Sequence, residues 1–565
     1  MAGVRGFGDA NIDRSKNVTA FSQKSDKSSG SYLNPWYLNY LGGDWKDKTQ
    51  CIYSGSNGWK QNHRAWNHGT NDRWVIEQNG YSIGYLKKDD IPFHFAAAEN
   101  WIVGDAYQES VMASTSPNRA MLISGSINSP GGPQSPNQGG NPYIDNNESP
   151  GCEDGINCYP LKWKTAGEFY EENKVSWTVF QNTGDNFDDN PYAWFEQFQK
   201  AAKDSALHQR GIVGEPLQAF YDRARNGTLP QVSLIVGPKQ QSEHTPWAPR
   251  DGAYLHKLIT DAVIHSPLYN KSALIVSYDE TGGWYDHVNP FHAPDGTPAE
   301  WIDDPYGGTG RTIIGPGFRV PFWIVSPWTR NGGVYTEHSD HNSQILFIEK
   351  WLAAKGINVT TDQMVHWRRQ NMGDLVSAFD FAHPDYSIPT LPSVAKPANN
   401  GRGNCDSSKH ERPPIPYSGN GQVQDLWTVV EKGFKSVRGL LTEGRFLVLE
   451  NSGKALTASD CSQNSAVSVS AATAQHEQAK QRFMVHQIDP YKNDFTITCS
   501  GDSYICKGGT LCNDSSGAIK FTIDFVPSSG HSFYNSEDGT YLGIQGGNLG
   551  FSAARQYWKL FSVSY

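Results

Sequence analysis

The sequence lacks any apolar run of the length, about eighteen residues, that a membrane-spanning helix requires. None of its eight cysteines has the paired C-x-x-C spacing that is typical of zinc sites. Basic side chains are also in the minority, with 48 Lys and Arg against 58 Asp and Glu, and they are scattered along the chain. These absences argue against a membrane-spanning protein, a cysteine-built metal site and a nucleic-acid binder that works by neutralising phosphates.

Large apolar rings, in contrast, are plentiful. Aromatic residues make up 12% of the chain and include 18 Trp, within a hydrophobic total of 37%. Such a chain can offset its conformational entropy by burial, so we expect a folded protein. Because 565 residues exceed what a single hydrophobic core supports, we expect two or three domains.

Two features indicate an oxidising, extracellular compartment. The cysteine count is even, and Cys152 and Cys158 flank a short acidic loop, so we expect them to close a small disulfide ring. Six N-x-S/T sequons occur, at Asn17, Asn147, Asn226, Asn270, Asn358 and Asn513. The first residues, from Met1 to Gly6, have no apolar core of a signal peptide, which conflicts with a secreted location.

Residues 1–395 have the pattern of one α/β domain. Apolar runs at 232–236, 273–277 and 320–325 predict strands buried on both faces. Apolar residues at helical spacing over 252–265 predict a helix between the first two strands. A strand, a helix and a strand over this length indicate a parallel sheet with a crossover connection.

The amino-acid composition changes after residue 395. Proline, glycine, asparagine and serine dominate the region that follows, so we expect a linker over 396–425. Residues 426–565 then show short alternating strands, and three similar hairpins begin at Phe446, Phe495 and Phe533. A Gln-x-aromatic triplet follows the first and third hairpins, and the set resembles a β-trefoil of the ricin-lectin type.

The sharpest local feature of the first domain is the adjacent acidic pair Asp279 and Glu280, which ends a predicted strand. Open α/β sheets place ligands at this edge. Two neighbouring carboxylates repel each other unless a cation or a proton lies between them, so the pair suggests a metal site. Gly282 and Gly283 allow a sharp turn that leaves the carboxylates uncovered. The alternative is a strand end with two solvated acids.

A second feature is Thr115, just ahead of a helix that Pro117 is expected to initiate. Its hydroxyl would lie at the positive end of that helix, where an attacking oxygen or a bound phosphate is stabilised. The alternative is an ordinary helix cap. Histidines form a third feature: His244 follows a predicted strand, His341 opens a helix behind Asp340, and His63 lies in an aromatic-rich region. An exposed His341 beside a capping Asp340 is the structural alternative there.

In order along the chain, these motifs resemble the phosphoesterase family of phosphatidylcholine-type phospholipases C and acid phosphatases. The motif sequences are most similar to those of the fungal branch. The matching segments are residues 3–7 (GVRGF), 62–67 (NHRAWN), 115–119 (TSPNR), 243–246 (EHTP), 278–288 (YDETGGWYDHV), 319–328 (RVPFWIVSPW) and 340–349 (DHNSQILFIE). The resemblance implies an alkaline-phosphatase-like α/β fold with a mostly parallel sheet between helices, followed here by the small all-β, trefoil-like domain.

The resemblance also implies roles. Thr115 matches the phosphoryl-accepting hydroxyl, and His244 matches a catalytic histidine near the phosphoryl group. Asp279 and Glu280 match the ligands of a divalent metal ion of unknown identity. Substrate-binding roles are expected for five residues: His63, Asn67, Asn118, His287 and His341. The implied reaction is hydrolysis of a phosphodiester, such as phosphatidylcholine, by in-line attack at phosphorus, with transient contact to a membrane surface.

One departure from the family pattern concerns the metal. Relatives carry an E-N-R-S-F-D-like run just before G-V-R-G-F, on the loop after their first strand, whose Glu and Asn are further metal ligands. Here Met1 and Ala2 precede that block directly, so we expect a truncated N-terminus, a sheet short of one strand and weak or absent activity.

Two other functions stay open. The first is an acid phosphatase of the same fold, which hydrolyses phosphomonoesters. The second is a non-catalytic carbohydrate-binding protein that binds a glycan through the C-terminal repeats. Trefoil sugar sites pair an Asp with an aromatic ring, and only the third repeat offers such a pair, Asp538 and Tyr541. A C-terminal module without any ligand is the structural alternative.

Overall fold

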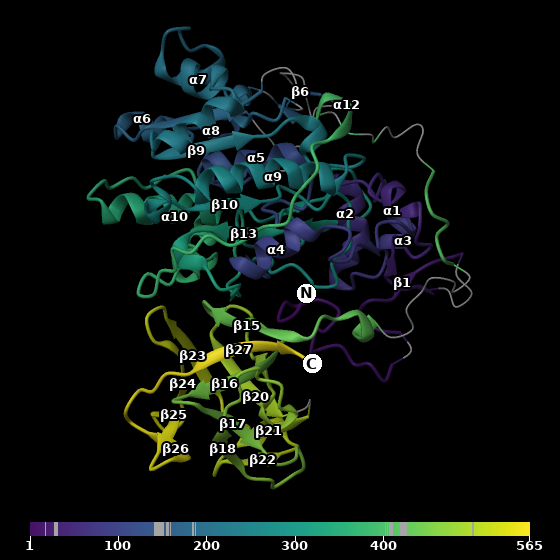
Figure 1. The fold of residues 1–565 in the computed structure, drawn as a ribbon, viewed down its shortest axis with the longest axis vertical. Coiled ribbons are helices and arrows are strands. Elements are labelled where there is room, and N and C mark those ends of the chain that lie inside the picture. Colours follow the sequence, from purple (N-terminus) through teal and green to yellow (C-terminus); the bar gives the residue numbers. More distant parts are fainter. Residues whose placement is uncertain are drawn as a thin grey trace.

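The computed structural model describes residues 1–565 except for 17, 28–31, 140–151, 154–156, 159, 183–185, 187, 402, 404, 406–410, 418–425 and 500–501. A large part built from helices and strands carries the first 400 residues or so, and a smaller all-β part lies below it (Figure 1). Among the helices of the described residues, none combines the length and apolar character needed to cross a membrane.

The strands of the larger part that concern the site form two separate ladders. β8 (Trp177–Gln181) pairs in parallel with β9 (Val232–Val236). β10 (Leu274–Ser277) pairs antiparallel with β13 (Phe322–Val325), which in turn pairs antiparallel with β5 (Ile102–Gly104). β5 is parallel to β14 (Val334–Tyr335). The strand pairing is therefore mixed, whereas the sequence had suggested a mostly parallel sheet.

Helices pack against these strands. Two of the helices begin with residues singled out in the sequence, Thr115 and His341. The helices of six or more residues are α2 (Trp59–Trp66), α4 (Pro92–Asn100), α5 (Thr115–Ser124), α6 (Ala166–Glu172), α8 (Leu217–Asn226), α9 (Pro249–Ile264), α10 (His341–Ala354) and α11 (His366–Asn371). Met121 of α5 packs in one core cluster with Val179 of β8. Leu255 and Val263 of α9 pack in another with Val325 of β13.

The local predictions from sequence agree well with these elements. β9 has the predicted bounds, β10 and β13 each lack one or two predicted residues, and α9 begins at Pro249, three residues earlier than predicted, because proline is favoured in the first helical turn. The predicted crossover does not place the two strands in one ladder. β9 and β10 make no ladder with each other in the described part of the chain, although a helix connects them.

Their predicted burial on both faces is also wrong. All five residues of β8 and all four of β13 are buried, whereas β10 is partly exposed throughout and β9 is buried only at Val236. An apolar run predicts that a strand will be covered, but it does not specify which element covers it. Among the described strands, each of these two has a ladder partner along one edge only.

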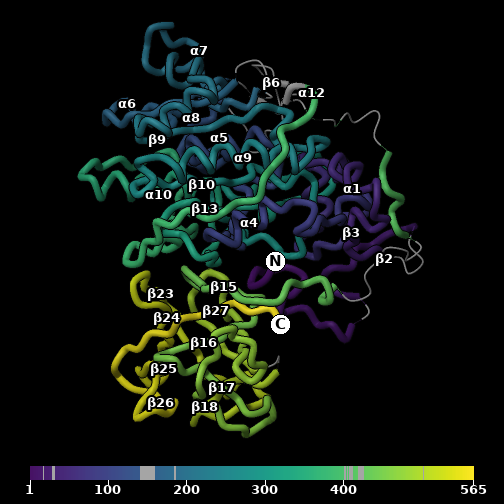
Figure 2. Tube along the Cα trace, in the orientation of Figure 1, coloured from purple at the N-terminus to yellow at the C-terminus, as the bar shows by residue number. Residues whose placement is uncertain are grey.

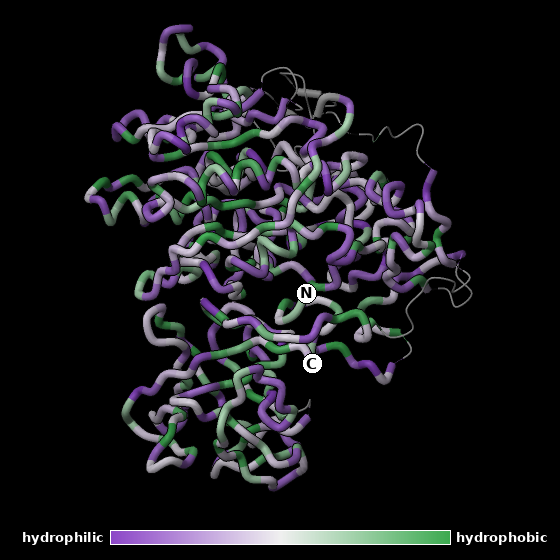
Figure 3. Tube along the Cα trace, viewed as in Figure 1, coloured by the Kyte–Doolittle hydropathy of each residue, from purple (hydrophilic) through white to green (hydrophobic). Residues whose placement is uncertain are grey.

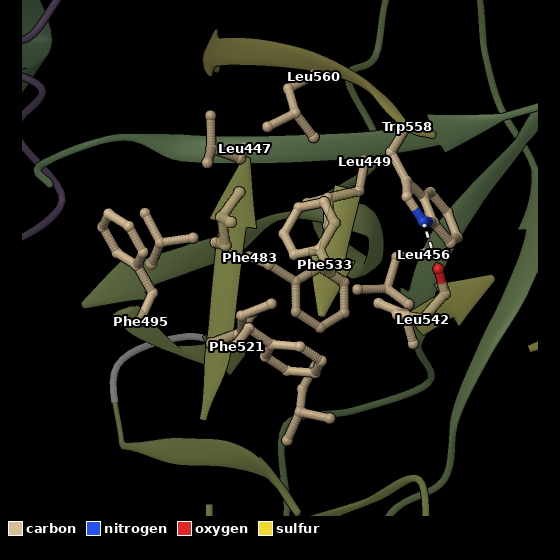
Figure 4. Packing of buried hydrophobic residues seen from close by; sticks show 14 of the residues in the cluster. Leu447, Leu449, Leu456, Phe483, Phe495, Phe521, Phe533, Leu542, Trp558 and Leu560 are labelled. Atoms are coloured by element: carbon tan, nitrogen blue, oxygen red, sulfur yellow. Dashed lines mark hydrogen bonds between the residues drawn. The ribbon is translucent and has the colours of Figure 1, made fainter. Parts of the chain in front are cut away.

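The all-β part repeats one arrangement three times. Its four-strand units are β16 (Phe446–Asn451), β17 (Lys454–Ala458), β18 (Val467–Ala471) and β19 (Phe483–Gln487); β20 (Asp494–Cys499), β21 (Ser503–Cys506), β22 (Thr510–Cys512) and β23 (Phe521–Val526); and β24 (Gly530–Asn535), β25 (Thr540–Gln545), β26 (Asn548–Ser552) and β27 (Lys559–Ser564). The first strand of each unit contacts the last, through β16–β19, β20–β23 and β24–β27. Phe483, Phe533 and Trp558 fill the shared core, where Trp558 Nε1 donates to the Leu542 carbonyl at 3.0 Å (Figure 4).

A strand and a buried ion pair are among the contacts that join the two parts. β15 (Gly433–Arg438) pairs with β27 through its first residues and with β14 through its last. It therefore links the all-β part to the larger part. Beside it, the Arg445 guanidinium contacts the Asp105 carboxylate, and both side chains are at most 1% exposed. The traces of β15 and β27 run together along this boundary (Figure 2).

Three disulfides are present among the described residues: Cys51–Cys405, Cys461–Cys499 and Cys506–Cys512. The first ties the segment that we expected to be a linker to the region after the short helix α1 (Trp45–Lys48). The expected ring between Cys152 and Cys158 falls on residues whose side chains lie outside the described ones. The described sequon asparagines are all exposed, namely Asn226, Asn270, Asn358 and Asn513.

Candidate active site

Two loops meet at the carboxyl ends of β9 and β10. Glu243 and His244 lie in the loop after β9, and Asp279 and Glu280 directly follow Tyr278 after β10. The Tyr278 hydroxyl donates to Glu243 Oε2 at 2.7 Å, which holds the two loops together. Both strands therefore run toward the same site, with the acidic pair at its edge.

The first turns of α5 lie against this pair. Thr115 is the first residue of α5 and only 5% exposed, and Ser114 occupies the N-cap without a side-chain capping bond. Arg119, one turn further along, donates from Nε to Asp279 Oδ2 at 2.8 Å and lies 3.5 Å from Asp189. Burial alone would raise the pKa of Asp279, but the Arg119 guanidinium holds that pKa below its usual value.

Glu280 is held by neutral hydrogen-bond donors instead. Its Oε1 accepts from Asn57 Nδ2 at 3.0 Å and its Oε2 accepts from the Gly282 backbone N–H. The same Asn57 amide nitrogen lies 3.4 Å from Nε2 of His244. Burial, with the Asp279 charge beside it, raises the pKa of Glu280 to about 7. Glu280 is thus covered, with 6% of its surface exposed, whereas the Asp279 side chain is 27% exposed.

The predicted turn after the acidic pair is present. Gly282 and Gly283 have φ values of 62° and 74°, in the region that favours glycine. A Cβ at Gly283 would also lie 2.5 Å from the backbone of Gly55, so glycine is required by space as well as by conformation. The turn brings its own N–H back onto Glu280, which is why the carboxylate is covered rather than displayed.

His341 reaches the site from the opposite side. Asp340 caps α10 in a capping box, as the sequence suggested, but His341 is buried and not exposed. Gln344 Nε2 donates to the Tyr107 hydroxyl at 2.8 Å, so that hydroxyl donates to His341 Nδ1 at 2.9 Å. His341 Nε2–H then donates to the Asp279 carbonyl oxygen at 2.7 Å. Burial lowers the pKa of His341, in keeping with this neutral tautomer.

Three of the expected substrate-binding residues contact the protein itself. His63 is 1% exposed, with its ring nitrogens 2.8 Å from the carbonyl oxygens of Trp59 and Ile313. Asn67 ends α2 and donates to Asp72 at 3.0 Å. Asn118 is fully buried, and its amide bonds the backbone of residues 111–114 and fixes the loop that leads to Thr115.

His287, the fifth expected substrate-binding residue, belongs to a second polar cluster. Its Nε2 lies 3.1 Å from Asp9 Oδ2, and Asp9 also accepts from Arg5 Nε at 2.6 Å. Asp286 next to it forms an ion pair with Arg319 at 2.7 Å. The structure therefore gathers His244, Asp279, Glu280 and His341 with the start of α5, and it places His287 among different partners.

Sequence reasoning missed three residues of this site. Arg119 was inside a quoted motif, but its pairing with Asp279 was not foreseen. Asn57 lies shortly before the block that contains His63 and carried no signal of its own. Glu109 is fully buried with one carboxylate oxygen unpaired, and burial together with the nearby Glu280 raises its pKa well above the usual value. Nothing in the sequence around Glu109 marks it as part of the site.

Protein donors already contact the acidic pair. Asp279 accepts from a guanidinium and Glu280 from two N–H groups, each through one bond per oxygen. Their role as metal ligands stays a prediction. The described residues contain one cluster with three metal-ligating groups within 4.8 Å of one another, and it consists of His94, Glu243 and His256. The two imidazole Nε2 atoms lie 2.9 and 3.3 Å from Glu243 Oε1.

Comparisons with known proteins agree on a family. A profile of the Phosphoesterase family matches residues 1–353. A non-hemolytic phospholipase C of Burkholderia pseudomallei is 30% identical over 476 residues, covering 78% of this chain and 63% of the relative. One of Pseudomonas aeruginosa is 34% identical over 424 residues, covering 70% of this chain and 57% of the relative. This chain therefore spans about three fifths of the length of these curated relatives.

A solved structure also matches part of the chain. It is described as a protein in the alkaline phosphatase superfamily from Vibrio parahaemolyticus, with 12% identity and a TM-score of 0.28, and the match covers 50% of this chain and 63% of that one.

Proposed function

Because this chain belongs to the phosphoesterase family, we propose that it hydrolyses phosphodiester bonds in phospholipids of the phosphatidylcholine type. Relatives named phospholipase C support this reaction class. One structural observation carries the proposal: the helix that Thr115 opens is tied through Arg119 to the acidic pair after β10. A nucleophile and an array of charge-stabilising groups, far apart in sequence, thus meet at one edge of the sheet.

In the proposed reaction, the Thr115 hydroxyl oxygen attacks phosphorus in line with the leaving oxygen. The new O–P bond forms as the bond to the diacylglycerol oxygen breaks, and the equatorial oxygens face the positive end of α5. His244 Nδ1 lies 2.7 Å from the Thr245 carbonyl oxygen and so carries the proton, which leaves Nε2 to accept the proton of Thr115. His244 passes this proton to the leaving diacylglycerol oxygen. Water then attacks phosphorus, the Thr115 O–P bond breaks, Thr115 regains a proton and the phosphorylated headgroup leaves.

The divalent cation that the resemblance implies stays a proposal, and no step above depends on it. When bound, such an ion would neutralise phosphoryl oxygens. The cluster of His94, Glu243 and His256 offers nitrogen and carboxylate ligands of the kind that zinc accepts. Assaying protein freed of metal by chelation, and again after adding Zn²⁺ or Mg²⁺, measures this dependence.

Replacing the nucleophile tests the proposal directly. We expect Thr115→Val, which keeps the shape but removes the hydroxyl, to lower hydrolysis of phosphatidylcholine in mixed micelles by at least about a hundredfold. Thr115→Ser should retain part of the activity, and Thr390→Val, at an exposed threonine outside every sequon, should retain all of it. Full activity in Thr115→Val would contradict the assigned nucleophile. Faster turnover of an aryl phosphate monoester than of the lipid would favour the acid phosphatase alternative.

We also propose that the protein is secreted, contacts membrane surfaces transiently and carries N-linked glycans. Three disulfides and four exposed sequon asparagines support an oxidising compartment. A mass decrease after endoglycosidase treatment of protein from a eukaryotic host tests this. The threefold strand pattern supports a trefoil-like accessory domain. Asp538 and Tyr541 stay the proposed glycan-binding pair, to be tested on a glycan array.

A further inference from the structure

Two histidines and a glutamate converge next to the candidate active site, and we call them the His–Glu–His cluster. His94 lies in the first turn of α4, His256 lies in the middle of α9, and Glu243 lies in the loop between β9 and α9. The Nε2 atoms of His94 and His256 lie 2.9 and 3.3 Å from the same oxygen, Glu243 Oε1. Three elements that are distant in sequence therefore bring two nitrogens and one oxygen to a single point.

The spacing of these atoms is that of ligands around one zinc ion. Zinc binds histidine nitrogen and carboxylate oxygen at about 2.0–2.2 Å, so neighbouring ligand atoms of a tetrahedral set lie about 3.3 Å apart. The two distances from Glu243 Oε1 are close to this value. The side chains of His94 and His256 are 13% and 18% exposed, so solvent reaches the cluster and water can complete the ligand set.

The surroundings of Glu243 hold its carboxylate in this place. Glu243 has a φ of 64°, a left-handed conformation that is uncommon for a residue with a side chain and that recurs at functional sites. A Cβ on Gly252 would lie 2.1 Å from Glu243 Cγ, so a glycine within α9 makes room for the carboxylate. Oε2 accepts from the Tyr278 hydroxyl at 2.7 Å, an outer bond of the kind that orients metal-binding carboxylates. Oε1 is left to face the two imidazoles.

The His–Glu–His cluster lies on one face of the sheet that contains β13. Successive side chains of a strand point to opposite faces. Along β13, Trp323 and Val325 pack in one core with α4 and α9, whereas Phe322 and Ile324 pack in another with α10. Hydrophobic residues gather in this interior of the larger part (Figure 3). The centroid of the His256 ring lies 5.2 Å from that of Trp323, which places the cluster on the face covered by α4 and α9.

The acidic pair is contacted from the other face. α5, which Thr115 opens, packs against α10. These two helices supply Arg119, which donates to the Asp279 carboxylate, and His341, which donates to the Asp279 carbonyl oxygen. The cluster is therefore a site separate from the acidic pair, and an ion in it acts on the loop that carries His244 rather than on the substrate.

We propose that the His–Glu–His cluster binds one Zn²⁺, which fixes the loop that carries His244. Each imidazole binds the ion through Nε2 in its neutral form, and Glu243 binds it through Oε1. Because Glu243 directly precedes His244, the ion holds the proposed catalytic base in place without touching the substrate. The importance of His244 rests on the proposed function, whereas the zinc site itself does not.

Zinc titration of the full chain, prepared without an affinity tag, tests the site. The protein is freed of metal by chelation and titrated with Zn²⁺ against a chromophoric zinc chelator, which gives affinity and stoichiometry together. We expect His256→Gln to weaken the tightest zinc site at least about a hundredfold, since losing even an outer-shell partner costs about ten- to a hundredfold. His265→Gln, at an exposed position after the same helix, should bind zinc like the unchanged protein. If His256→Gln does not fold, X-ray absorption of zinc on the unchanged protein decides, because it should show two imidazole ligands.

Glu280→Gln separates this site from the acidic pair. Zinc should bind Glu280→Gln as tightly as the unchanged protein, and in both it should slow hydrogen exchange of the amides in residues 242–247. Equal zinc affinity of His256→Gln and the unchanged protein overturns the proposal, and so does loss of binding in Glu280→Gln. If zinc binds but leaves the exchange of these amides unchanged, the ion does not fix the loop. None of these results bears on the proposed hydrolysis, which Thr115→Val tests separately.

Discussion

Replacing Arg445 with methionine should cost the protein about 3 kcal/mol of stability, at the low end of the range for breaking a buried ion pair. Arg445 Nε donates to Asp105 Oδ2 at 3.2 Å and its Nη2 contacts Oδ1, and the two side chains are 1% and 0% exposed. The variant would leave the Asp105 carboxylate buried with one remaining donor, the Arg5 backbone N–H at 3.0 Å. That remaining bond is why we expect the lower end of the range.

A double variant distinguishes two costs: the lost attraction between Arg445 and Asp105, and the penalty of leaving the Asp105 charge buried without a partner. Asp105→Leu combined with Arg445→Met removes both charges, so most of the stability should return. Arg555→Met serves as the matched control, because Arg555 pairs with Asp524 at 3.2 Å on the exposed surface of the same β part. Exposed pairs contribute about 0–1 kcal/mol.

The assay is urea unfolding followed by tryptophan fluorescence, with phospholipid hydrolysis measured in parallel. Asp105 directly follows β5 and begins the segment that leads to Thr115, so we expect Arg445→Met to lower activity as well as stability. If Arg445→Met costs no more than Arg555→Met, or if the double variant is as unstable as the single one, the pair does not stabilise the junction in the way described.

Two further predictions concern pH. The pKa of Glu280, raised to about 7, lies above the usual carboxyl value, so its contribution to stability is complete below pH 4.5 and is lost as the pH rises to 7. Glu280→Gln should therefore be more stable than the unchanged protein at pH 8 and similar to it at pH 4, and identical urea midpoints at pH 8 would contradict the assignment. The pKa of His531, lowered to about 4 by burial, gives the opposite sign: its contribution is present above pH 6.5 and is lost as the pH falls to 4. His531→Gln retains a donor for the Gly439 carbonyl and should reduce the acid-induced loss of the β part, as followed by circular dichroism.

Strand and helix positions could be predicted because they depend on local periodicity. The run 232–236 alone specified a strand, and apolar spacing specified the helix before residue 265, to within a few residues. Pairing partners could not be predicted in the same way. The antiparallel neighbour of β10 is β13, almost fifty residues later, and no local pattern in either strand encodes that partner or its direction.

The candidate site could be predicted from the sequence where its residues are adjacent along the chain. Asp279 and Glu280 are neighbours in sequence, and their mutual repulsion already required a compensating group. The sequence led us to predict a metal ion as that group, and the structure adds Arg119 beside Asp279 and a pKa of Glu280 raised to about 7. Arg119 comes from 160 positions away, and only the packing of α5 against the loop after β10 brings it there.

The spacing of the two loops at the candidate site depends on side chains. The loops after β9 and β10 carry Glu243 with His244 and Asp279 with Glu280, and the described residues form no backbone ladder between the two strands. The distance between these loops is held by the Tyr278 bond to Glu243 and by the Asn57 contacts to Glu280 and His244. Side-chain contacts are a softer constraint than a continuous sheet, because each depends on rotamers that a ladder does not. The alignment of His244 with the acidic pair, which the proposed reaction requires, therefore depends on Tyr278 and Asn57.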